Sequence, residues 1–460
     1  MLPIVLLSVF GIVVLFLGFS KSKNILLPAT LLFLLVTLIA NFVDWNHQYL
    51  YFNDMLWGNN ASMVFSGIVL LSAFFVVALT RGFEQEGEAA QPAEYYGIML
   101  FSLVGAIMMI SYENLIILFV GVEILSVSIY VLTGSDKRNL RSNEAALKYF
   151  LMGAFATGIM LFGMALMYGA TGSFVISDIS EIIGTRAWNE QSQLLYAGIL
   201  MLLVGLLFKV SAAPFHFWTP DVYDGAPTIF TAYMSTIVKT AGFAALYRLL
   251  AGSLASLQDY WFATLATITV LTLLAGNVTA VYQTSFKRML AYSSISHAGY
   301  LLIALTSLTA KSQNSILFYS LAYSLSTISA FGVLILVSQQ QASNDYDAFN
   351  GLAKKNPFLA FVLAVSMLSL AGIPLTAGFM GKLFVFSDAA EKGTIWLLVV
   401  AVLASAIGIY YYFRVLIAAY FKEGDLATIR IAPFYKVVLI IVTTLTIVLG
   451  LFPDLVLKLV

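Results

Sequence analysis

The stretch Gly205–Thr228, GLLFKVSAAPFHFWTPDVYDGAPT, places a lysine inside a long apolar run that prolines then interrupt. Lys209 lies five residues before Pro214, where a charged side chain costs about 2.5–3.5 kcal/mol even on the mildest membrane scale. Pro214, Pro220 and Pro227 cannot continue an ordinary helix. Broken membrane helices persist only where the freed backbone lines a cavity or is buried in protein. The stretch therefore predicts a discontinuous membrane helix beside an ion path.

Composition places the whole chain in the membrane. Of its 460 residues, 61% are hydrophobic and 10% are charged, whereas soluble domains carry about 25% charged residues. Apolar runs of about 20 residues, the length that a ~30 Å hydrocarbon core requires, fill nearly the whole sequence. We therefore predict an all-α polytopic membrane protein with no soluble domain. The first apolar segment lacks a basic start and a small-residue cleavage site, so we expect a retained membrane helix rather than a signal peptide.

The chain has no cysteine and only three histidines. The lack of thiols excludes thiolate-ligated iron–sulfur clusters, disulfides and thiol catalysis. We also expect no haem or zinc site built by this chain. Any redox chemistry connected with it is therefore expected in other chains.

Fourteen hydrophobic spans are predicted, at approximately 2–20, 25–43, 61–81, 95–111, 113–133, 143–169, 192–217, 227–250, 260–282, 288–308, 313–338, 357–388, 394–421 and 431–456. The even count puts both termini on one side of the membrane. Thirteen lysines and arginines lie on the side of the membrane that holds the loop after the first span. Five lie on the opposite side: Arg186, Arg248, Lys311, Lys392 and Lys458. The positive-inside rule then places both termini outside the cytoplasm.

A weak internal repeat relates the seventh span to the twelfth. The run Ser211–Pro214 (SAAP) matches Ala371–Pro374 (AGIP), and each ends in a mid-membrane proline with a lysine nearby, Lys209 or Lys382. Paired interruptions in corresponding halves of a transporter mark its central pathway. Proline and glycine are generally common in membrane helices, but the accompanying lysines favour a true repeat.

Besides Lys209, a carboxylate and two lysines lie within predicted membrane spans: Glu123, Lys239 and Lys382. Glu123 is the only carboxylate at mid-span, so it either carries a proton or has a basic partner, for which Lys209 is the candidate. Lys239 follows Pro227 by twelve residues, which is ~18 Å along a helix and close to the bilayer midplane. Lys382 is nearer a helix end, where burial and snorkelling to the interface are equally expected.

Glu123 and Lys209 together predict a proton switch. A carboxylate beside a buried lysine favours the charged form of the lysine. Movement of Glu123 toward or away from Lys209 would therefore change how readily the lysine releases its proton. Further lysines after this pair predict stepwise proton transfer along the plane of the membrane.

Four other residues are candidate accessory or relay groups. His297, within YSSISHAGY (292–300), is interpreted equally well as a proton relay or as a hydrogen-bonded packing residue. His216 lies at the helix break and is expected to be structural. Glu144 and Lys148 open the sixth span four residues apart and are expected to pair locally.

These motifs together resemble the antiporter-like membrane subunits of respiratory complex I, the proton-pumping NADH:quinone oxidoreductase, and among them subunit N. The similar segments are FVGVEILSVSIYVL (119–132), EAALKYFLMGAFATG (144–158), KVSAAPFHFWTPDVYDGAPT (209–228), KRMLAYSSISHAGYLL (287–302), FYSLAYSLSTISAFGVL (318–334) and LSLAGIPLTAGFMGK (368–382). They cover the fifth to twelfth spans in the expected order. Tyr319 and Tyr323 stand where M and L subunits and multisubunit cation/proton antiporters usually carry histidine, which favours subunit N.

The resemblance implies a fourteen-helix architecture. Helices one to three (1–94) would precede two inverted five-helix repeats (95–251 and 259–422), with discontinuous helices seven and twelve, and a last helix (423–460). It implies that Glu123 tunes Lys209, that Lys239 is the connecting lysine, and that Lys382 lies near the outward exit. His297 would help to join the two halves.

The same resemblance implies a non-redox subunit of a proton translocase in the bacterial inner membrane. NADH, FMN, iron–sulfur clusters and a quinone would be bound by other subunits. Neighbouring M- and K-type subunits and lipid are the expected partners, and no nucleic acid is expected. A subunit of a multisubunit cation/proton antiporter or of a membrane-bound hydrogenase is the alternative, because it would share the lysines. A scaffold is disfavoured, because it would not need to bear the desolvation cost of several buried charges.

Overall fold

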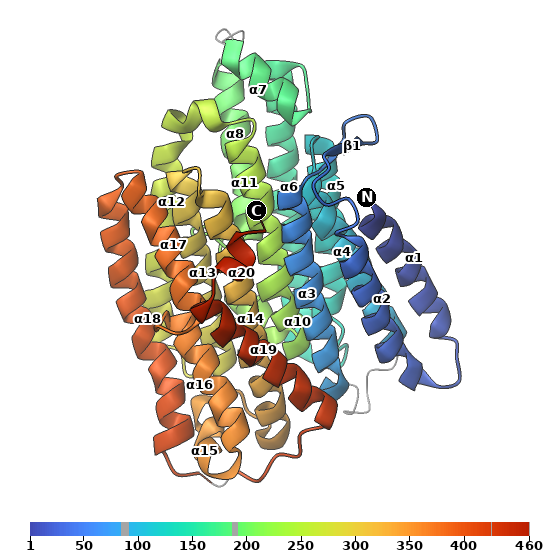
Figure 1. Ribbon diagram of the computed structural model, residues 1–460, viewed down its shortest axis with the longest axis vertical. Coiled ribbons are helices and arrows are strands. Elements are labelled where there is room, and N and C mark those ends of the chain that lie inside the picture. The colour runs from blue at the N-terminus through green and yellow to red at the C-terminus, as the bar shows by residue number, and fades with distance from the viewer. Residues whose placement is uncertain (84–91, 186–191, 425, 460) are drawn as a thin grey trace.

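The computed structural model describes residues 1–83, 92–185, 192–424 and 426–459, which form one bundle of long helices (Figure 1). Arg186, one of the five basic residues assigned to the outer side, lies outside these residues. Both termini lie toward the end of the bundle that carries α7 (Ile176–Thr185). The two described ends of the chain therefore lie on the same side of the bundle, as an even number of membrane spans requires.

Each predicted span corresponds to a helix or to a series of helices. The first six are α1 (Leu2–Leu17), α2 (Leu26–Ala40), α3 (Asn60–Phe83), α4 (Pro92–Ser111), α5 (Leu115–Thr133) and α6 (Leu140–Thr171). The seventh is divided into α8 (Ser192–Lys209) and α9 (Trp218–Gly225), and the eighth comprises α10 (Thr228–Tyr233), the π-helical segment Met234–Val238 and α11 (Lys239–Ala251). The others are α12 (Gln258–Val281), α13 (Phe286–Ser307), α14 (Ser312–Gln341), α16 (Pro357–Ala371) with α17 (Ala377–Glu391), α18 (Ile395–Phe421) and α19 (Pro433–Leu451).

Within the described residues, twelve helical segments are long and apolar enough to cross a membrane. The apolar helices α1 and α16 are shorter. Together these segments account for the fourteen predicted spans. The remaining helical elements are turns of three or four residues at Lys23–Ile25, Ala255–Leu257, Tyr346–Phe349, α15 (Leu352–Lys355) and α20 (Asp454–Leu457).

Two polar connections contain structure that the hydropathy pattern did not predict. Strands β1 (Tyr49–Tyr51) and β2 (Leu56–Gly58) form an antiparallel hairpin between α2 and α3, with Leu50 opposite Trp57. The amphipathic helix α7 follows α6 and buries three isoleucines, Ile176, Ile179 and Ile183. Both elements are far shorter than the ~20 residues of a membrane span, so a search for long apolar runs does not detect them.

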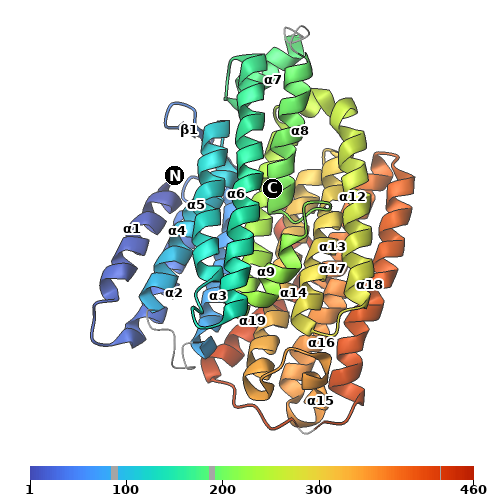
Figure 2. The same ribbon diagram turned by 180° about the vertical axis from the view of Figure 1, so that it is seen from behind.

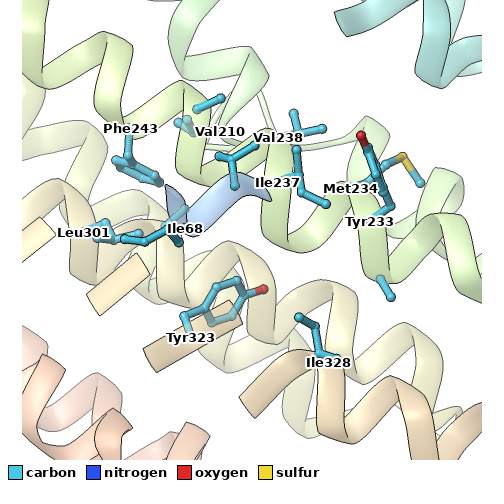
Figure 3. Close-up of a cluster of buried hydrophobic side chains, with 14 of the residues drawn as sticks. Ile68, Val210, Tyr233, Met234, Ile237, Val238, Phe243, Leu301, Tyr323 and Ile328 are labelled. Atoms are coloured by element: carbon cyan, nitrogen blue, oxygen red, sulfur yellow. The ribbon is translucent and has the colours of Figure 1, made fainter. Parts of the chain in front are cut away.

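The most buried helices lie at the centre of the bundle. The α10–α11 segment, α13 and α14 are almost completely covered by other helices, whereas α2, α6 and α18 lie at the perimeter with apolar side chains facing outward (Figures 1 and 2). Figure 3 shows the core around the π-helical segment, where Ile68, Ile237, Leu301 and Ile328 belong to one cluster of buried side chains. Lys239 of α11 and His297 of α13 are therefore surrounded by protein.

Both predicted helix interruptions are present. Residues 210–217 separate α8 from α9, and residues 372–376 separate α16 from α17, with Pro214 and Pro374 inside these turns. The backbone freed by the first break finds partners on other elements: Ala213 N donates to Thr272 Oγ1 on α12, at 2.9 Å. At the second break, Gly378 N donates to Ser369 Oγ, at 3.0 Å. Satisfied backbone groups allow such breaks inside a membrane protein.

The role expected for Pro220 is wrong. Pro220 does not break the helix but lies in the first turn of α9, where the missing N–H would have had no partner in any case. The seventh span consequently continues to Gly225, beyond its predicted end near residue 217. Pro227 is the N-cap residue of α10, so the next helix begins directly after this proline, at the predicted start of the eighth span.

Candidate functional site

Lys209 is the last residue of α8, and its ammonium faces hydroxyl groups on α5 and α6. Nζ donates to Ser126 Oγ at 2.7 Å and to Tyr149 OH at 3.5 Å, and the residue is only 3% exposed. The ring of Tyr149 is stacked on Trp218 of α9, with 4.3 Å between ring centroids. Neutral hydroxyls solvate an ammonium without neutralising it. Lys209 is thus held by groups that do not force it to remain charged.

Glu123 lies one helical turn before Ser126 on α5. The described residues show no hydrogen bond to its Oε1, which is buried, while Lys209 is hydrogen-bonded to Ser126 instead. Glu123 is nevertheless close enough to Lys209 to interact with it electrostatically. On α5, the direct polar contact of Lys209 is therefore the Ser126 hydroxyl, and Glu123 acts on the lysine from a longer distance.

Lys239 begins α11 directly after the π-helical segment Met234–Val238. Its Nζ donates to the main-chain oxygen of Ser294 on α13, and the residue is 2% exposed. π-helical turns are rare and are frequently found at functional sites. The predicted mid-membrane position of Lys239 thus corresponds to a buried contact between two central helices.

His297 on α13 has a tyrosine hydroxyl at each ring nitrogen. Nδ1 lies 2.7 Å from Tyr319 OH on α14, and Nε2 lies 3.0 Å from Tyr412 OH on α18. Lys239 and Lys382 are both close enough to interact with the imidazole electrostatically. The histidine is therefore near both lysines, which it also separates in the sequence.

Lys382 is buried, so the snorkelling alternative is wrong. It is 5% exposed, and its Nζ donates to Ala371 O at 2.8 Å and to Ser405 Oγ at 2.9 Å. Ala371 ends α16, where unpaired helix carbonyls favour a cation. Gly372 has a φ of +82°, and a Cβ there would lie 2.7 Å from Lys382 Cδ. Gly372 therefore adopts the positive φ of the turn and also leaves room for the side chain of Lys382.

The helices that carry these residues follow one another across the bundle. The order α5, α8, α11, α13 and α17 leads from the first half of the chain to the second (Figures 1 and 2). We call Glu123, Lys209, Lys239, His297 and Lys382 the transverse line. Its hydroxyl partners on α5, α6, α14 and α18 were not predicted, because serine and tyrosine are common in these helices and only packing reveals which of them face a lysine.

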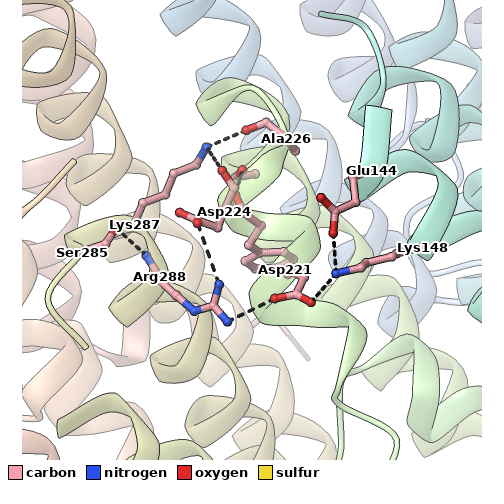
Figure 4. Close-up of polar contacts among 10 residues, drawn as sticks. Glu144, Lys148, Asp221, Asp224, Ala226, Ser285, Lys287 and Arg288 are labelled. Atoms are coloured by element: carbon pink, nitrogen blue, oxygen red, sulfur yellow. Dashed lines mark hydrogen bonds and ion pairs between the residues drawn. The ribbon is translucent and has the colours of Figure 1, made fainter. Parts of the chain in front are cut away.

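A charged network at the other end of the bundle from the termini joins three helices (Figure 4). The predicted Glu144–Lys148 pair is confirmed at 2.8 Å, but Lys148 also contacts Asp221 of α9 at 2.9 Å. Asp221 in turn contacts Arg288 of α13 at 3.1 Å. Lys287 donates to the main-chain oxygens of Asp224 and Ala226 at the end of α9. The pair is therefore one part of a link between α6, α9 and α13.

Asp221 is expected to contribute modestly to stability through this network. Its two carboxylate oxygens accept hydrogen bonds from different helices, Oδ2 from Lys148 at 2.9 Å and Oδ1 from Arg288 at 3.1 Å. The Asp221→Asn substitution should cost about 0.2–1 kcal/mol per lost pair, because these side chains are partly exposed. Glu144→Gln, which removes only the contact with Lys148, should cost less.

His216 lies in the first helix break. Its main-chain oxygen accepts a hydrogen bond from Thr219 N at 2.9 Å, which helps to start α9. Its Nδ1 is buried and has no hydrogen-bond partner among the described residues. The side chain is not part of the transverse line.

A buried ion pair lies at the end of the bundle that carries the termini. Arg248 contacts Glu113 at 3.0 Å, and both side chains are about nine-tenths buried. The guanidinium also lies 4.7 Å from the ring centroid of Trp57 in β2, and Ser177 N at the start of α7 donates to Glu113 Oε1. Arg248, which was counted as an outer charge from the sequence, is therefore a structural partner of the hairpin and α7. Among the described residues, no three His, Cys, Asp or Glu side chains form a group that could hold a metal ion.

Comparison with known proteins identifies the family. Residues 112–408 match the family described as "NADH:quinone oxidoreductase/Mrp antiporter, TM". NADH-quinone oxidoreductase subunit N of Cytophaga hutchinsonii is 42% identical over 457 residues, which cover 99% of this chain and 98% of that protein. This chain belongs to the subunit N family. The subunit N protein of Flavobacterium psychrophilum is 40% identical over 99% of each chain.

Solved structures share the fold of this subunit N family member. A chain of respiratory complex I from Thermus thermophilus with bound aureothin is 36% identical, with a TM-score of 0.86, and the match covers 99% of this chain and 98% of that chain. A chain of the Mrp complex from Dietzia sp. is 20% identical, with a TM-score of 0.83 over 100% of this chain and 94% of that chain. The Mrp match shows a common fold. The subunit N relatives are in addition similar in sequence, over 99% of this chain.

Proposed function

We propose that this chain is a proton-translocating membrane-arm subunit of NADH:quinone oxidoreductase. The transverse line is the observation that carries the proposal: five titratable side chains lie on neighbouring helices, and each lysine and the histidine has polar partners inside the membrane. Ionisable residues at such depth are costly and mark ion and proton pathways. The chain acts through protonation alone, while NADH, FMN, iron–sulfur clusters and quinone belong to other subunits.

The transverse line supports a stepwise mechanism. The carboxylate of Glu123 favours the ammonium form of Lys209, so withdrawal of Glu123 or its neutralisation promotes release of the proton. The proton passes to the amine of Lys239, then to His297 through its tyrosine partners, and finally to Lys382. Each transfer leaves a neutral donor, which then takes up a new proton from the preceding site. Quinone reduction in other subunits supplies the free energy that moves Glu123.

The helix order supports two inverted repeats, at 95–251 and 259–422. Each repeat holds five spans, and an odd number of spans makes the second repeat start on the opposite side of the membrane from the first. The breaks that contain Pro214 and Pro374 occupy the fourth span of each repeat, and broken helices in corresponding halves are typical of transporter pathways. Residues 1–94 and 423–460 flank the repeats.

We place the chain in the bacterial inner membrane with both termini on the periplasmic side. The shared end of the two termini and the excess of basic residues on the opposite side support this orientation. Neighbouring M- and K-type subunits and lipid would cover the apolar perimeter.

Affinity purification of the tagged chain from its host membranes tests the assignment. NADH-oxidising, iron–sulfur-containing subunits should co-purify, and the reconstituted complex should translocate protons on addition of NADH and a quinone. Co-purification with cation/proton antiporter or hydrogenase subunits, without NADH oxidation, would instead support the alternative function.

A further inference from the structure

Asp388 is a buried carboxylate that the transverse line does not include. It lies on α17 six residues after Lys382, about 9 Å further along the helix axis, and is 1% exposed. Its Oδ1 accepts a hydrogen bond from Thr309 Oγ1 at 3.1 Å. Its Oδ2 is buried with no hydrogen-bond partner in the described part of the chain. A buried carboxylate with one open oxygen is costly as an anion and readily accommodates a proton.

The surroundings of Asp388 lead from the membrane interior to the surface. Ser312 and Ser315 of α14 place their hydroxyls beside the carboxylate. The next charges beyond it are Lys311 and Glu391, which form a 2.9 Å ion pair with side chains 70% and 44% exposed. Asp388 therefore lies between the buried Lys382 and an exposed ion pair at the end of the bundle that carries the termini.

The titratable neighbours of Asp388 allow its carboxylate to gain and lose a proton. Lys311 and Glu391 act on it with opposite signs from the surface, and Tyr247 faces it from α11. None of these groups is a buried cation in contact with the carboxylate. Asp388 is thus not locked as an anion by a salt bridge, and it lies three residues before the exposed Glu391 at the end of α17.

We propose that Asp388 accepts the proton that Lys382 releases and delivers it to the outer surface. The inference rests on the proposed function. The ammonium of Lys382 gives one proton, through water, to the carboxylate of Asp388, which leaves a neutral amine and a neutral acid. The acid then loses the proton to water at the end of α17, where Lys311 favours the returning carboxylate. Lys382 is reloaded from the His297 side.

A purely structural role for Asp388 makes a different prediction. In that case the carboxylate would only tie α17 to the turn between α13 and α14 through Thr309. Asparagine retains an oxygen acceptor for Thr309 and the shape of the side chain, but it cannot carry a proton. The Asp388→Asn substitution therefore separates proton transfer from tethering, and Thr309→Val removes the tether without removing the carboxylate.

The test uses the purified complex that contains this chain, reconstituted into liposomes. We expect Asp388→Asn to assemble but to pump protons at least about tenfold more slowly, the effect of losing a proton-transfer group. Asp388→Glu should pump, with a shifted pH profile, and Thr309→Val should pump at nearly the parent rate. Asp259→Asn is the matched control: this exposed aspartate opens α12 at the same end of the bundle, and its loss should change nothing.

The outcomes distinguish this inference from the proposed function. Full pumping by Asp388→Asn, together with loss of pumping in Lys382→Met, would overturn the role of Asp388 alone. Full pumping by both variants would overturn the proposed pathway as well. If Asp388→Asn fails to assemble, the Asp388→Glu profile decides: a shift supports proton transfer by Asp388, and a profile identical to that of the parent refutes it.

Discussion

Replacing Lys209 by methionine is expected to lower NADH-driven proton pumping by about 10²-fold, the effect of removing a group that must bind and release the proton. The complex should still assemble, because methionine is unbranched and apolar and adapts to a buried site. Ser126 keeps its hydrogen bond to Val122 O after the change. Pumping is measured in proteoliposomes with a pH-sensitive dye, alongside coupled quinone reduction.

The Lys209→Arg substitution shows whether the charge or the proton matters. Arginine preserves the positive charge but does not release its proton in proteins, so this variant should be nearly as defective as Lys209→Met. Lys436→Met is the matched control, because Lys436 is an exposed lysine on α19. Normal pumping by the arginine variant would contradict proton release from Lys209.

The sequence predicted the fold well because the signals for membrane spans are local. Runs of apolar residues located the fourteen spans, and the prolines of the two breaks located the interruptions. The hairpin and α7 were missed because they are short and lie in polar connections. The network around Asp221 was missed for another reason: Lys148 and Asp221 are 73 positions apart, so only the packing of α6 against α9 brings them together.

Lys382 shows how depth counted along a helix can mislead. Its position near a helix end left snorkelling and burial equally expected. Side chains on a helix lean toward its N-terminus, and for α17 that direction leads to the break and the last carbonyl of α16. The side chain therefore points into the protein, where its Nζ donates hydrogen bonds to Ala371 O and Ser405 Oγ. This contact depends on the helix break, which depth counting does not include.

The roles within the Glu123–Lys209 pair can be separated by a double-mutant cycle. Glu123→Gln preserves the shape of the side chain but removes its charge, and an opposite charge nearby changes proton affinity by about tenfold or more. We therefore expect pumping to fall about tenfold in Glu123→Gln, less than in Lys209→Met, because Glu123 tunes a proton site and does not replace it. Glu181→Gln, at an exposed glutamate of α7, is the control.

Combining the two substitutions should add little to the loss caused by Lys209→Met alone. If Glu123 acts only through the lysine, removal of the lysine leaves it nothing to tune, and the two effects become strongly non-additive. If Glu123 were instead an independent proton carrier, the two losses would multiply. The open Oε1 of Glu123 and the serine contact of Lys209 favour tuning, because a carboxylate without a fixed partner is free to approach or leave the lysine. Multiplied losses in the pumping rate of the double variant would show that this interpretation is wrong.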